Sequence, residues 1–66
     1  MNERIESLWK DATSYANEAT SDLDVWHGIR REKFAELIVR ECLSIADRKG
    51  AYEVMDDIID HFGVEL

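Results

Sequence analysis

Residues 34 to 46 are Phe-Ala-Glu-Leu-Ile-Val-Arg-Glu-Cys-Leu-Ser-Ile-Ala, the longest apolar-rich run in the sequence. On a helix, which turns about 100° per residue, the apolar side chains of this run spread over an arc of roughly 240°. A helix with one buried face needs an apolar arc of only about 100°. The run therefore predicts a central helix, from about residue 29 to residue 49, that is covered by neighbours on two sides.

The start of this helix is the least clearly marked feature of the sequence. Gly28 costs about 1 kcal/mol in a helix interior, and Val25 and Ile29 fall off the apolar seam when the helix is extended backwards. We therefore expect a short turn at residues 22–27 and a helix that begins between Gly28 and Arg31. The alternative is that Ser21 or Asp24 caps one continuous helix. At the other end, Gly50 suits the left-handed residue that follows a helix.

Two further helices flank the central one. The first, at residues 3–19, has helically spaced apolar side chains and a suitable N-cap residue in Asn2. The last, at residues 51–62, ends before Gly63, which would form a Schellman motif with Val64 as the next residue. With no proline and no alternating apolar pattern, we expect an all-α, three-helix fold in a single helical domain, residues 1–66.

The size and composition of the chain favour a small protein that associates with itself. A chain of 66 residues buries only about 60% of its unfolded surface, and the single cysteine excludes an internal disulfide framework. We therefore expect a homodimer, and its interface on the outer arc of the central helix, at Val39, Leu43 and Ala46. The sequence shows neither a signal peptide nor an apolar run of membrane-spanning length. A soluble, cytoplasmic protein is expected.

The charge is strongly acidic and unevenly distributed. Fifteen acidic and eight basic residues give a net charge of −7. The acidic excess lies at the two ends, whereas residues 25–50 carry six bases and four acids. Proteins that bind duplex DNA normally present a basic stripe, so no duplex nucleic-acid binding is expected. An acidic surface instead favours a partner with a basic surface.

Two groups of side chains are candidates for binding. Four acids project within about 100° of arc on the last helix, and they could imitate DNA phosphates or dock on a basic groove; the alternative is an ordinary solvated face. The acids are Glu53, Asp56, Asp57 and Asp60. The second group combines aromatic, imidazole and cationic side chains that could hold a nucleotide, or could simply pack and neutralise nearby acids. It consists of Trp26, His27, Arg30, Arg31 and Lys33.

Catalytic chemistry finds little support in the sequence. Cys42 falls within the apolar arc of the central helix, where we expect it to be buried and therefore a weak nucleophile. A Cys-His pair would need a fold that brings His27 or His61 to the core. The acids near His61 have only generic helical spacing, which is weak evidence for a metal site. We expect a protein that is not an enzyme and has no metal or cofactor.

Two motifs resemble short, uncharacterised proteins of tailed bacteriophages. They are the segment Lys-Phe-Ala-Glu-Leu-Ile-Val-Arg-Glu-Cys-Leu-Ser-Ile-Ala-Asp at 33–47 and the segment His-Phe-Gly-Val-Glu at 61–65. The resemblance covers residues 33–66 and carries no catalytic residues. It implies a phage accessory protein that acts in the host cytoplasm, where such small acidic proteins often bind and disable a host enzyme or defence component.

Three hypotheses about function follow from these observations. The first is a non-enzymatic phage protein that inhibits or redirects a host bacterial protein. If that host protein belongs to a defence system, the phage protein is a counter-defence factor. The second is a sponge that sequesters a nucleotide signal between subunits. The third is a structural component of the virion.

Overall fold

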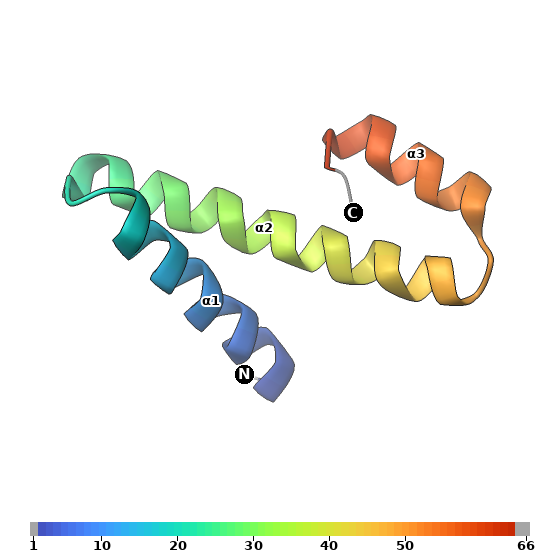
Figure 1. Cartoon of the computed structure of the whole chain (residues 1–66), viewed down its shortest axis with the longest axis horizontal. Helices are drawn as coiled ribbons and strands as arrows, with labels where there is room; N and C mark the ends of the chain where they lie inside the picture. Colours follow the sequence, from blue (N-terminus) through green and yellow to red (C-terminus); the bar gives the residue numbers. More distant parts are fainter. Residues whose placement is uncertain (1, 65–66) are drawn as a thin grey trace.

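The computed structural model describes residues 2–64, which fold into three helices and no strand. These are α1 (Glu3–Ala19), α2 (Leu23–Arg48) and α3 (Tyr52–Phe62). In Figure 1, α1 and α3 each fold back along α2 from its opposite ends. Both pack on α2 and, within the described residues, they do not pack on each other. The all-α, three-helix prediction is thus confirmed, and α2 is the element that holds the other two.

The expected start of α2 between Gly28 and Arg31 is wrong, because the helix already begins at Leu23. Its N-cap is Asp22, whose carboxylate accepts a hydrogen bond of 3.0 Å from the backbone N–H of Asp24. The backbone carbonyl of Asp22 also accepts from the N–H of Trp26, at 2.8 Å. The early start places the Trp26 side chain against α1, and this packing offsets the cost of about 1 kcal/mol of a glycine in the helix interior.

The first helix, α1, begins where the sequence predicts, directly after the N-cap residue Asn2. The side-chain oxygen of Asn2 accepts hydrogen bonds from the backbone N–H groups of Arg4 and Ile5, at 2.9 and 3.1 Å, and so caps two of the open donors of the first turn. The buried face of α1 consists of Leu8, Ala12 and Ala16. Two of these three residues are small, which lets α1 approach α2 closely.

Two glycines end the second and third helices, as expected, but they do so with different hydrogen bonds. Gly50 has φ +72° and Gly63 has φ +67°. After α2, the N–H of Ala51 donates to the carbonyl of Ala46 at 2.9 Å and that of Gly50 to Asp47 at 3.0 Å, the two bonds of a Schellman motif. After α3, the N–H of Gly63 donates to Ile59 at 2.7 Å, the bond of the simpler αL cap. The Schellman motif therefore lies at Gly50, and not at Gly63 as the sequence suggested.

The central helix is covered on two sides, but incompletely. Leu43 is the buried residue of α2 and Met55 that of α3, and these two helices pack on each other. Leu43 therefore cannot serve in self-association as we expected, while Val39 and Ala46 are only half-buried. Cys42, expected in the core, is exposed because it lies on an arc that neither flanking helix covers.

Candidate interaction surface

The four acids of α3 form one exposed surface, which we call the acidic face. Glu53, Asp56, Asp57 and Asp60 are all exposed. Among residues 2–64, the ion pairs join Arg4 to Glu41 and both Lys33 and Arg40 to Glu36, so none of them neutralises the acidic face. Residues 51–66 contain no lysine or arginine. The face is thus a concentrated and uncompensated negative charge on one side of the molecule.

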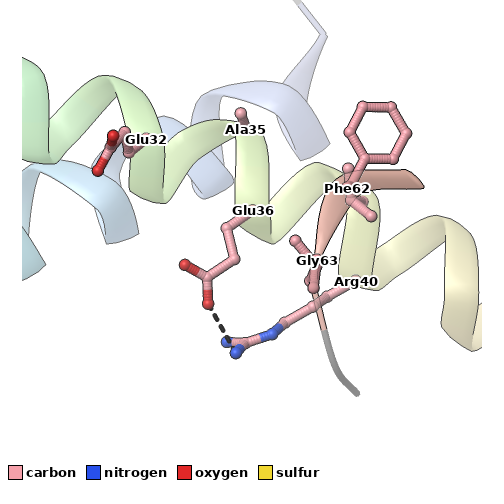
Figure 2. Close-up of a pocket in the computed structure, with 8 residues that line it drawn as sticks. Glu32, Ala35, Glu36, Arg40, Phe62 and Gly63 are labelled. Carbon is pink, nitrogen blue, oxygen red and sulfur yellow. Dashed lines mark ion pairs between the residues drawn. The ribbon is translucent and has the colours of Figure 1, made fainter. Parts of the chain in front are cut away.

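A groove of about 570 Å³ lies between α2 and the end of α3. Phe62 and Gly63 form one side of it, and α2 forms the other (Figure 2). The Phe62 side chain is 58% exposed. Beside the groove, Glu36 and Arg40 make an ion pair of 2.6 Å. The lining residues therefore include both apolar and charged ones. They are Glu32, Ala35, Glu36, Val39, Arg40, Phe62, Gly63 and Val64.

Arg30 is enclosed between two indole rings where α1 meets α2. Its guanidinium carbon lies 4.2 Å from the centre of the Trp9 ring and 4.3 Å from that of the Trp26 ring. The indole N–H of Trp26 donates to the side-chain oxygen of Asn17 over 2.8 Å. Trp9 in turn meets the Phe34 ring edge-on at 5.0 Å. This Trp–Arg–Trp cluster joins the two helices through cation–π contacts and one hydrogen bond.

The five residues predicted to hold a nucleotide do not line one common cavity. Trp26 and Arg30 belong to the Trp–Arg–Trp cluster, so their faces are occupied by the protein itself. His27 meets the edge of Trp26 at 5.0 Å and is exposed, as is Arg31. Lys33 lies 4.4 Å from the centre of the Tyr15 ring. Of the five, only Lys33 lines the second cavity, of about 170 Å³, together with Tyr15, Ala19, Ile29, Glu32 and Glu36.

One surface was missed in the sequence, an exposed row of apolar side chains along α2. The row, which we call the α2 stripe, consists of Ala35, Ile38, Cys42 and Ile45. Its spacing of three, four and three residues is the a/d pattern of paired helices. The breadth of the apolar arc in residues 34–46 concealed the pattern, because the stripe is embedded among other apolar residues.

Comparisons with protein-family models, with curated proteins and with solved structures returned no match. No helix in residues 2–64 combines the length and the apolar character needed to span a bilayer. Within the same residues, no three histidine, cysteine, aspartate or glutamate side chains are grouped so that they could hold a metal ion. The surfaces described above are therefore the basis for a functional proposal.

Proposed function

We propose that this chain is a non-enzymatic binding protein whose acidic face on α3 captures a basic surface of another protein. The observation that carries the proposal is that Glu53, Asp56, Asp57 and Asp60 are all exposed and have no ion-pair partner among residues 2–64. The resemblance of residues 33–66 to phage accessory proteins supports a bacterial host protein as the target. Binding would inhibit or redirect that host protein, for example a component of the host's defence.

The electrostatics of the acidic face suit such a partner. Like charges at spacings of three and four residues on a helix cost about 0.2 to 0.5 kcal/mol per pair, and a basic partner relieves this repulsion. Complementary charge also steers the encounter, so that association is fast at low salt and slows as salt is added. A basic groove that normally binds DNA phosphates is one surface that would recognise this row of carboxylates.

The test is capture of a host protein by the tagged chain from a bacterial lysate, followed by binding measurements with the purified target. Replacing three carboxylates by amides, Asp56→Asn, Asp57→Asn and Asp60→Asn together, should abolish capture and leave the helical content unchanged. The matched control is Glu6→Gln, Asp11→Asn and Glu18→Gln, which removes the same charge from exposed positions of α1. The control should still capture the target, with an affinity that falls as salt increases.

Two results would contradict the proposal. If the α3 variant captured the target as well as the wild type does, the acidic face would be an ordinary solvated surface and not a binding site. Equal loss in both variants would show that total charge, and not the placement of the acids on α3, determines binding.

A further inference from the structure

We infer that the α2 stripe is the contact surface for a second copy of this chain. All four of its residues are exposed, although Ala35 also lines the groove beside Phe62. On one side of the stripe, Phe34 packs against Trp9 and Glu41 pairs with Arg4, so this side of α2 belongs to α1. On the other side, Leu43 is fully buried, and α3 packs on α2. Between them the stripe spans about 80° of arc, with Ile38 and Ile45 exposed at 36% and 51%.

The molecule exposes more surface than a compact monomer of its mass. Its accessible surface is 5050 Å², whereas a compact monomer of 7.7 kDa would expose about 4,300 Å². The excess of about 700 Å² is close to the roughly 800 Å² that each partner buries in a standard protein interface. The radius of gyration of 13.4 Å likewise exceeds the value of about 11 Å for a compact chain of this length. A second copy on the α2 stripe would bury part of this excess.

The chemistry of the stripe favours a copy of the same chain over a basic partner. Its four members, Ala35, Ile38, Cys42 and Ile45, carry no charge, and their a/d spacing is complementary to an identical helix. Pairing along α2 also limits the charge repulsion between two chains of net charge −7. Residues 25–50 carry more bases than acids, so this pairing joins the least acidic parts and leaves the acidic face of α3 outside.

The mass of the protein in solution tests this inference directly. Light scattering at micromolar concentration should give twice the chain mass of 7.7 kDa. Ile38→Lys combined with Ile45→Lys should halve the measured mass, since two lysines would face their copies across the seam. The control Val54→Lys changes an equally exposed apolar residue on α3 and should leave the mass doubled. Circular dichroism on each variant reports whether the helices are retained.

The thiol of Cys42 gives a second test that needs no variant. It is exposed in the single chain, so it should react freely with a disulfide reagent when the protein is dilute. As the concentration rises, the reaction rate should fall in proportion to the remaining monomer, because pairing covers the stripe. This measurement decides the question even if the lysine variants lose their fold.

Three outcomes overturn the inference. The first is a wild-type monomer with a cooperative unfolding transition. The second is an oligomer in which Cys42 reacts as fast as in dilute protein. The third is a folded Ile38→Lys, Ile45→Lys variant that keeps twice the chain mass. The amide variant of the acidic face should still form the dimer, so this inference and the proposed function can fail independently.

Discussion

Trp26 on α2 donates its indole N–H to the side-chain oxygen of Asn17 on α1, over 2.8 Å. Because α2 begins at Leu23, Trp26 lies in its first turn, within reach of Asn17 in the last turn of α1. The same ring forms one face of the enclosure around Arg30. The connection between α1 and α2 is therefore stabilised by side chains that are polar or charged as well as apolar.

Replacing Arg30 should weaken this connection. Arg30→Gln removes the cation from between the Trp9 and Trp26 rings, and we expect a loss of about 1 to 2 kcal/mol in the free energy of unfolding. The neighbouring Arg31 is exposed, so Arg31→Gln should change stability by no more than about 0.5 kcal/mol. Urea unfolding, followed by tryptophan fluorescence at one protein concentration, measures both variants. Equal effects would show that the cation–π contacts contribute nothing to stability.

Two glycines should respond to alanine with opposite signs. A Cβ at Gly28 meets no atom within 4 Å beyond its chain neighbours and the local helix backbone. Since the residue lies inside α2, Gly28→Ala should stabilise the protein by about 0.5 to 1 kcal/mol. Gly50 has φ +72°, where Gly50→Ala should destabilise by about 1 to 2 kcal/mol. Thermal unfolding of the two variants beside the wild type measures the difference. Destabilisation by Gly28→Ala would mean that the helix does not run through this position.

The cap of α2 can be tested with two adjacent residues. Asp22→Ala removes the carboxylate that accepts from the backbone N–H of Asp24, and we expect a loss of about 1 kcal/mol. Ser21 is exposed and precedes the cap, so Ser21→Ala should be close to neutral. Circular dichroism during urea unfolding provides the comparison. If Ser21→Ala lowered the stability more than Asp22→Ala, the N-cap of α2 would be Ser21 and not Asp22.

Leu43 should be the most sensitive apolar position of α2. It is the one large side chain that is fully buried in the described part of the chain, so Leu43→Ala should cost about 2 to 5 kcal/mol. Val54→Ala serves as the control, because Val54 is 53% exposed on α3. Equilibrium unfolding gives both values. A small effect of Leu43→Ala would show that this side chain is not buried in the folded protein.

The helices themselves could be predicted from the sequence wherever local chemistry determines them. Asn2, Gly50 and Gly63 act as the predicted helix ends because capping depends on residues close in sequence. The start of α2 could not be predicted in this way. It depends on the contact of Trp26 with Asn17, nine residues earlier and on another helix, and this tertiary contact outweighs the low helix propensity of Gly28.

The same distinction, between what local sequence determines and what tertiary packing determines, applies to the candidate surfaces. The exposure of the acidic face follows from its position opposite the buried Met55 on one helix, which periodicity can show. Which parts of the apolar arc of α2 remain open depends on where α1 and α3 pack. Leu43 and Cys42 are adjacent in sequence, yet one is buried and the other exposed. Periodicity within α2 places both in the arc and cannot distinguish them.

The lack of contact between α1 and α3 has a consequence for motion. Within residues 2–64 each of these helices packs only on α2, and α3 buries little beyond Met55. Opening of α3 therefore breaks the contacts of one interface and leaves the α1–α2 hairpin with its Trp–Arg–Trp cluster intact. Backbone amides of α3 should exchange with solvent through this smaller opening, and those of the α1–α2 pair only through a larger one. We therefore expect the helix that carries the acidic face to open before the α1–α2 pair does.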